Sequence, residues 1–137
     1  MKKFIPLLVS GFLLFSCGVG DAEKIADQYH QNMENHSFET IVNQQLSEEA
    51  ISITPKAEWL DLFSQVMGLG DLKKIDKVSG FNSKMNNGVT TVILRYKYDF
   101  EGDVEDLYEK IILVRNGGDF KINGMAWHTD LNQLPTD

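Results

Sequence analysis

The residues best suited to acid–base chemistry occur in the second half of the chain. Tyr96 and Tyr98 have the same parity in the alternating stretch 88–100, so their hydroxyl groups would reach one face of a strand. His128 and Asp130 share a parity near the C-terminus, where a carboxylate beside an imidazole could support a general base. Alternatively, both tyrosines are core rings and His128 is a solvated strand-end residue. No catalytic motif accompanies these residues, so we expect no catalytic residue.

Histidines elsewhere and an acidic turn are weak metal-binding candidates. His30 and His36 are six positions apart, whereas helical zinc ligands are usually three to five apart, so surface histidines are the expectation. The acidic stretch 101–106 lacks the ligand spacing of a calcium loop. The sequence also has no glycine-rich phosphate loop. We therefore expect neither a metal nor a cofactor.

The N-terminus has the layout of a secretory signal. Lys2 and Lys3 precede an apolar stretch from Phe4 to Phe15, which at 12 residues is shorter than the roughly 20 that a membrane-spanning helix needs. The stretch ends in Leu14-Phe15-Ser16-Cys17, which resembles the bacterial lipobox, and Cys17 is the 1 cysteine of the chain. This resemblance implies cleavage before Cys17 and acylation of its sulfur, with the bilayer as the first partner.

The rest of the chain is long enough for one domain with its own core. We expect a signal peptide over 1–16, an acylated cysteine and short tether over 17–21, a domain over 22–130 and a polar tail over 131–137. The full chain has a formal net charge of −7, which argues against nucleic acid as a partner. Gly18 after the cysteine would favour the outer membrane if the host is Gram-negative.

Helical periodicity dominates the first half of the domain. Apolar residues recur at helical spacing from Asp21 to Met33, and a second short helix is predicted after Ser37. The segment 46–53 suits either a helical turn or a short strand. Thr54-Pro55 predicts the start of another helix, which Gly68 would end. This last helix presents its apolar residues at spacings of three and four: Trp59, Leu60, Phe63, Val66 and Met67.

The second half of the domain changes to the period of strands. Asn87-Gly88 predicts a tight hairpin between a strand over 73–85 and a strand over 88–100. Further strands are predicted over 106–115 and 120–129. Helices followed by strands indicate an α+β fold, in which N-terminal helices pack on a curved four-stranded antiparallel meander. Because segment 111–114 is apolar on both faces, the face away from the helices would need a curled sheet edge, the C-terminal tail or a partner subunit to cover it.

Several positions resemble a known superfamily. They are Trp59 in the last predicted helix, Leu69-Gly70 after it, Tyr96 with Phe100, and the segment 118–124. This pattern resembles the nuclear-transport-factor-2-like superfamily, which includes the SnoaL-like proteins, and within it exported bacterial domains of unknown function. The resemblance implies a cone-shaped α+β fold, but this fold serves enzymes, ligand carriers and structural modules alike.

Three hypotheses for the role remain open at this stage. The first is a non-enzymatic protein-binding module, with a homodimer through the open sheet face at Ile93, Ile111 and Leu113. The second is a carrier of a small apolar ligand inside the cone. The third is an enzyme of the ketosteroid-isomerase-like type with a Tyr/His/Asp pocket. The residues expected to line such a pocket are Phe63, Met67, Tyr96, Tyr98, Trp127 and His128.

Overall fold

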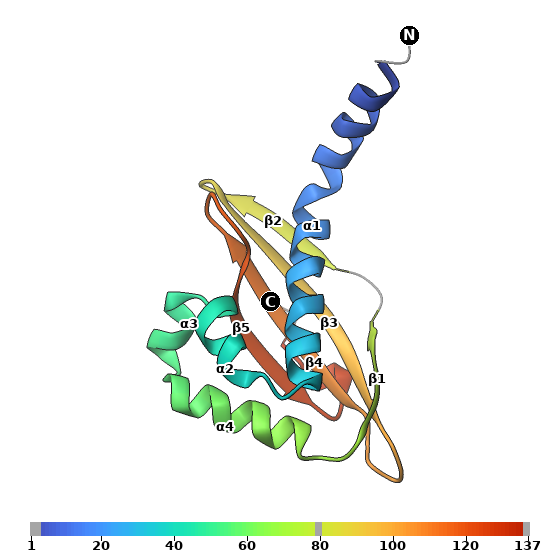
Figure 1. Cartoon of the computed structure of the whole chain (residues 1–137), viewed down its shortest axis with the longest axis vertical. Coiled ribbons are helices and arrows are strands. Elements are labelled where there is room, and N and C mark those ends of the chain that lie inside the picture. Colours follow the sequence, from blue (N-terminus) through green and yellow to red (C-terminus); the bar gives the residue numbers. More distant parts are fainter. Residues whose placement is uncertain (1–3, 79–80, 136–137) are drawn as a thin grey trace.

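The chain folds as N-terminal helices packed on one face of an antiparallel sheet, as the sequence predicts (Figure 1). The computed structural model describes the backbone of residues 4–78 and 81–135, and the side chains of residues 18–78 and 81–135. Cys17 and the signal segment before it lie outside the described side chains, so their assignment stays a prediction. Among the described residues, no helix is both long and apolar enough to cross a membrane.

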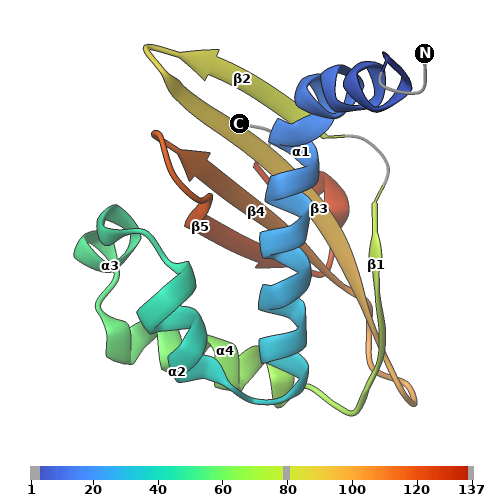
Figure 2. The ribbon, with the colours of Figure 1, turned by 45° about the horizontal axis from the view of Figure 1, so that its top comes forward.

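The helices follow one another with short connections. They are α1 (Phe4–Glu34), α2 (Phe38–Thr40), the π-helical turn η1 (Ile41–Gln45), α3 (Glu48–Ile53) and α4 (Lys56–Met67). Figures 1 and 2 show α1 crossing the sheet and α4 at its lower end, while α3 contacts β5. Residues 18–21, expected to be a tether, are helical and continuous with α1.

Local capping explains where the shorter helices begin. The ambiguous segment 46–53 becomes α3, because the Ser47 hydroxyl accepts a hydrogen bond from the Ala50 amide at 3.0 Å. The expectation of Thr54 as the cap of the next helix is wrong by one position. Thr54 closes α3, and Pro55 precedes Lys56 as the first residue of α4, with no side-chain cap.

The sheet contains one more strand than predicted. Its path is β1 (Leu72–Lys77), β3 (Val89–Phe100), β4 (Leu107–Arg115) and β5 (Lys121–His128), while β2 (Asn82–Asn86) also pairs with β3. The predicted single strand over 73–85 is thus two strands on the same edge of β3: Leu72 pairs with Phe100 at one end and Asn86 with Val89 at the other. Residues 79–80 between them lie outside the described part.

The predicted hairpin turn is confirmed. Asn86 pairs with Val89, and the two loop residues Asn87 and Gly88 have positive φ angles of 53° and 79°. Positive φ at both positions defines a type I′ turn, whose twist matches that of the flanking strands. The Asn-Gly dipeptide therefore fixes the register of β2 against β3.

The core lies between the helices and one face of the sheet. On β3 the residues of one parity, including Val92, Leu94 and Tyr98, are buried as the alternation predicts. They meet Tyr29 and Met33 of α1, which are fully buried. This packing fixes the position of α1 over the middle of the sheet.

The other face of the sheet is partly covered by the C-terminal segment. The one-turn helix η2 (Leu131–Gln133) lies behind the sheet, on the side away from α1, in Figures 1 and 2. Leu134 is buried although it does not belong to the helix-side core. The tail, expected to be polar, thus buries one leucine, and of the possible covers for this face the C-terminal tail is the one observed.

Candidate functional site

A buried carboxylate lies at the centre of the molecule. The Glu109 side chain on β4 is 0% exposed and contacts four hydrogen-bond partners. Oε2 accepts from the hydroxyl groups of Tyr29 and Tyr98 at 2.6 and 2.7 Å and from Trp127 Nε1 at 2.8 Å. Oε1 lies 2.7 Å from Nε2 of His30. An unpaired buried carboxylate is costly, and these contacts offset that cost.

The register of the sheet explains why these side chains meet. Glu109 pairs with Tyr96 of β3 and with Trp127 of β5, so the three side chains leave the same face. Tyr98 follows Tyr96 by two positions and therefore has the same orientation. Helix α1 then brings its adjacent residues Tyr29 and His30 down onto this face. Four elements thus contribute to the network.

Burial and charge hold the network tyrosines in their neutral form. Burial first, and the charge of Glu109 second, raise the pKa of Tyr29 and of Tyr98 well above the usual value. The pKa of Tyr96 is also raised, by burial and then by the charges of Asp27, Glu23 and Glu109. The hydroxyl groups of Tyr29 and Tyr98 therefore keep the protons that they donate to Glu109.

A cleft of about 440 Å³ opens beside the network, between α1 and the β1 edge of the sheet. Three carboxylates of α1, Glu23, Asp27 and Glu34, share a helical stripe with His30 and line one wall. The other described lining residues are Gln31, Ile75, Lys77 and Tyr96. The His30 ring touches the Tyr96 ring edge-on, with 4.4 Å between the ring centroids.

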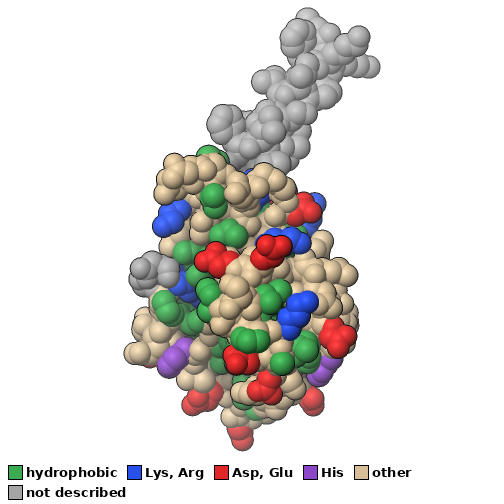
Figure 3. Space-filling model, turned by 90° about the vertical axis from the view of Figure 1, so that its left-hand side faces the viewer, with side chains coloured by type: hydrophobic (Ala, Val, Ile, Leu, Met, Phe, Trp, Pro, Cys, Tyr) green, Lys and Arg blue, Asp and Glu red, His purple; other side chains and the backbone are tan. Residues whose placement is uncertain are grey.

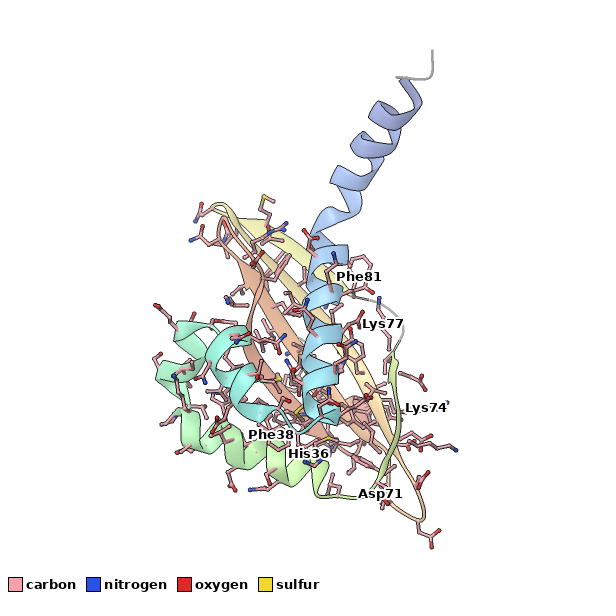
Figure 4. All side chains as sticks on the ribbon, in the orientation of Figure 1. His36, Phe38, Asp71, Lys74, Lys77 and Phe81 are labelled. Carbon is pink, nitrogen blue, oxygen red and sulfur yellow. The ribbon has the colours of Figure 1, made fainter. Side chains whose placement is uncertain are left out.

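The cleft has a surplus of negative charge. Among its described lining residues, Lys77 is the one lysine or arginine, and its Nζ lies 3.1 Å from Glu23. Figure 4 shows Lys77 and Phe81 beside α1, where the chain leaves β1 and returns to β2. Asp27 and Glu34 have no lysine or arginine among the lining residues left to balance them. The cleft therefore suits a positively charged group.

The predicted pocket residues lie at several different places. Phe63 and Tyr98 are fully buried, Met67 is buried at the end of α4, and Trp127 contacts both Phe63 and Glu109. Tyr96 lines the cleft. His128 is exposed at the end of β5, where its Nδ1 accepts from the Asp130 amide at 2.9 Å. The structure thus joins Tyr98 and Trp127 to Glu109, and it does not bring His128 to them.

The expectation that His30 is a surface histidine is wrong. His30 is 7% exposed, because its ring is held between Glu109 and the tyrosine rings of β3. His36, by contrast, is exposed and has a positive φ of 56° where the chain turns from α1 into α2. Among the described residues, no group of three His, Cys, Asp or Glu side chains is arranged to hold a metal ion.

The residues expected at a sheet-face interface lie on opposite faces. Ile111 and Leu113 are fully buried under the helices, so they cannot form part of an open surface. Ile93 and its cross-strand partner Ile112 occupy the other face. They line a groove of about 610 Å³ with Phe81, Thr91 and residues 82–84 of β2. Any interface on this face would therefore use Ile112 in place of Ile111 and Leu113.

Sequence reasoning missed Glu109, Tyr29 and the role of His30. One signal was present, because Glu109 has the same parity as the apolar residues Leu107, Ile111 and Leu113. A carboxylate at a buried strand position requires hydrogen-bond donors. Some of the donors that reach Glu109 come from α1, and strand parity does not reveal where α1 lies.

Comparison with models of known protein families gives no match, and comparison with curated proteins gives none either.

Proposed function

We propose that this chain is a lipid-anchored envelope protein whose domain binds a small organic cation, without catalysis, in the cleft between α1 and β1. The observation that carries the proposal is the stripe of Glu23, Asp27 and Glu34 along the cleft, opposed by the single paired cation Lys77. This proposal changes the expected ligand from apolar to cationic, because charged side chains line the described cleft.

The floor of the cleft supports a ligand that is an organic cation rather than a bare metal ion. Tyr96 and His30 line the cleft, and aromatic rings attract quaternary and guanidinium cations. A cleft that combines carboxylates with aromatic rings suits an alkylammonium or guanidinium group. A volume of about 440 Å³ is sufficient for such a ligand.

The buried network supports this role by fixing the floor. The contacts of Glu109 with Tyr29, Tyr98, Trp127 and His30 tie α1 to three strands. A preformed cleft reduces the ordering cost of binding. Because the Glu109 oxygens are occupied by internal donors, the carboxylate is a positioning group and does not meet the ligand.

Calorimetric titration of the full-length protein in detergent tests the binding proposal. The probe is choline, with 3,3-dimethylbutanol as the neutral probe of the same shape. We expect choline to bind and its neutral counterpart to bind at least about tenfold more weakly, because the carboxylates of the cleft attract the positive charge of choline. The Asp27→Asn variant should lose affinity, whereas Glu101→Gln, an exposed change in the β3–β4 hairpin, should not. Equal binding of both probes would contradict the proposal.

A second candidate is an enzyme, and the His30–Glu109 pair favours it. A buried carboxylate that accepts from one imidazole nitrogen orients the ring as a general base. His30 also lines the cleft, where a bound molecule would lie. This candidate predicts that incubation with a ligand of the cleft yields a new product by NMR, and that His30→Gln stops its formation. An unchanged ligand would favour the binding module.

The anchor and the superfamily complete the proposal. Helices that precede an antiparallel sheet of mostly meander strands support a place in the nuclear-transport-factor-2-like superfamily. Cleavage before Cys17 and acylation of its sulfur would place the domain on the cell envelope. Mass spectrometry of the membrane-extracted protein should give a mature chain that begins with a lipidated Cys17.

A further inference from the structure

We propose that one end of the domain, formed by the β2–β3 hairpin and the β4–β5 turn, rests on the phospholipid bilayer that holds the acyl chains. We call this end the hairpin end, and its described residues are 84–91 and 114–119. The inference rests on the proposed acylation of Cys17. It also predicts how the anchored domain is oriented, because it assigns a second contact between the protein and the lipid.

The structure places the start of the mature chain at the hairpin end. Gly18, next to the proposed lipid site, lies beside Arg115, since a Cβ on Gly18 would stand 3.8 Å from the Nη2 atom of Arg115. Arg115 also holds Asp21 at 3.0 Å, which fastens the first described turn of α1 to the end of β4. Arg115 pairs with Thr90, and Thr90 pairs with Met85. Arg115, Thr90 and Met85 therefore lie at the same height along the strands.

Both ribbon views agree with this placement. In Figures 1 and 2 the early part of α1 leaves the domain beside β2, at the end where the β2–β3 hairpin and the β4–β5 turn lie. The β3–β4 hairpin is at the opposite end of β3. An anchor attached before Gly18 would therefore bring the hairpin end towards the membrane, because residues 18–34 continue as one helix without a flexible spacer.

The two ends of the domain differ in their exposed apolar and acidic side chains, as expected if the hairpin end meets a bilayer. Met85, next to the β2–β3 turn, is 73% exposed, so this end presents an apolar side chain to its surroundings. No acidic residue occurs from Val78 to Leu94, where Lys84 supplies a positive charge. The β4–β5 turn carries Arg115 and one exposed acidic residue, Asp119. The opposite β3–β4 hairpin exposes Glu101, Asp103 and Glu105.

A bilayer therefore fits the hairpin end better than a soluble protein partner does. An exposed methionine enters the interfacial region readily, and a lysine beside it reaches the phosphate groups. Acidic side chains are repelled by anionic lipid, and the exposed ones of the β3–β4 hairpin are held away from it. On the face shown in Figure 3, hydrophobic side chains are scattered among charged and polar ones.

Quenching by lipid tests this orientation on the full acylated chain. Met85→Cys carries an environment-sensitive NBD label, and Ile53→Cys is the matched control, because both side chains are 73% exposed. The acylated Cys17 leaves the new thiol as the labelling site. Each protein is reconstituted into phosphatidylethanolamine–phosphatidylglycerol vesicles with and without doxyl-labelled lipid. We expect quenching at position 85 to exceed that at position 53 by at least about threefold, since only the hairpin end enters the interface.

The outcomes separate the orientation from the anchor. Equal quenching at both positions, in protein that floats with the vesicles and has an acylated mass, would overturn the orientation while the anchor stands. An unmodified Cys17 by mass spectrometry, in protein that does not float with vesicles, would overturn the anchor and the orientation with it. Strong quenching at position 53 alone would place α3 against the lipid and contradict the inference.

Discussion

Nε2 of His30 lies 2.7 Å from Oε1 of Glu109, although 79 positions separate the two residues in the chain. This contact joins α1 to the middle of the sheet inside the core. With Glu109 as a carboxylate, which can only accept, Nε2 of His30 carries the shared hydrogen. The contact therefore fixes both the packing of α1 and the orientation of the imidazole towards the cleft.

Removal of the buried carboxylate should destabilise the fold. Glu109→Ala leaves Tyr29, Tyr98 and Trp127 without their acceptor, so we expect a loss of about 3–5 kcal/mol in the free energy of unfolding. Glu109→Gln retains one acceptor oxygen and should cost less, about 1–3 kcal/mol. Urea denaturation followed by circular dichroism measures both values.

The control for this prediction is another glutamate of the same region. Glu105 is exposed before β4, and Glu105→Gln should change the free energy of unfolding by less than about 0.5 kcal/mol. A Glu109→Ala variant as stable as Glu105→Gln would show that the network contributes little to the fold.

Stability should fall in alkaline solution. The pKa values of Tyr29 and Tyr98 are raised in the folded state, so folding favours their neutral form. Their contribution to stability is therefore complete below a pH of about 10, which is the pKa of tyrosine in the unfolded chain. Above that pH the unfolded chain loses protons that the folded chain keeps. Each of the two tyrosines should then lower the free energy of unfolding by about 1.4 kcal/mol per pH unit.

Denaturation between pH 8 and pH 11 measures this slope. Tyr98→Phe should be less stable than the parent at pH 8, because a buried hydrogen bond to Glu109 is lost. Its stability should nevertheless decline less steeply above pH 10, since it has one fewer tyrosine to ionise. Identical slopes in the two proteins would argue against a raised pKa at Tyr98.

The β2–β3 and β4–β5 turns offer a pair of glycines for comparison. Gly88 has a φ of 79°, a conformation that an L-residue adopts only at a cost, so Gly88→Ala should destabilise by about 1–2 kcal/mol. Gly118 has open space around it and lacks a positive φ, so Gly118→Ala should lie within about 0.5 kcal/mol of the parent. Thermal unfolding of both variants checks the difference. Equal effects would contradict the type I′ assignment.

Arg115 should contribute to stability through two contacts. Its guanidinium lies 3.0 Å from Asp21 and 4.5 Å from the centre of the Phe120 ring. Because both contacts are partly exposed, we expect Arg115→Ala to cost about 1–2 kcal/mol in total. Lys73→Ala, at an exposed position of β1, is the control and should be close to neutral. A cost below that of the control would mean that the N-terminal turn of α1 is held by other contacts.

Most of the fold follows from local signals in the sequence. Alternation predicted the buried parity of β3, and Asn87-Gly88 fixed the hairpin register. The division of the predicted strand 73–85 into β1 and β2 could not be seen, because its apolar residues are sparse and give little period. The burial of Leu134 was also missed, since two leucines in a short polar tail carry no clear periodic signal.

The candidate site was less predictable, because it depends on contacts between distant segments. Tyr98 and Trp127 were recognised as candidates, but their shared acceptor Glu109 was not. His30 looked like a surface residue, because its burial results from the docking of α1 on β3 and β4. The cleft arises from the same docking, which places the acidic stripe of α1 opposite the β1 edge.

The most direct test of the cation-binding cleft is to locate the bound probe by NMR. Choline is titrated into the full-length protein in detergent while imidazole, tyrosine and isoleucine resonances are followed. The account predicts saturable shifts at His30 and Tyr96, with Ile93 and Ile112 of the opposite face unchanged. Shifts confined to those isoleucines, or no saturable shift at His30 and Tyr96, would contradict it.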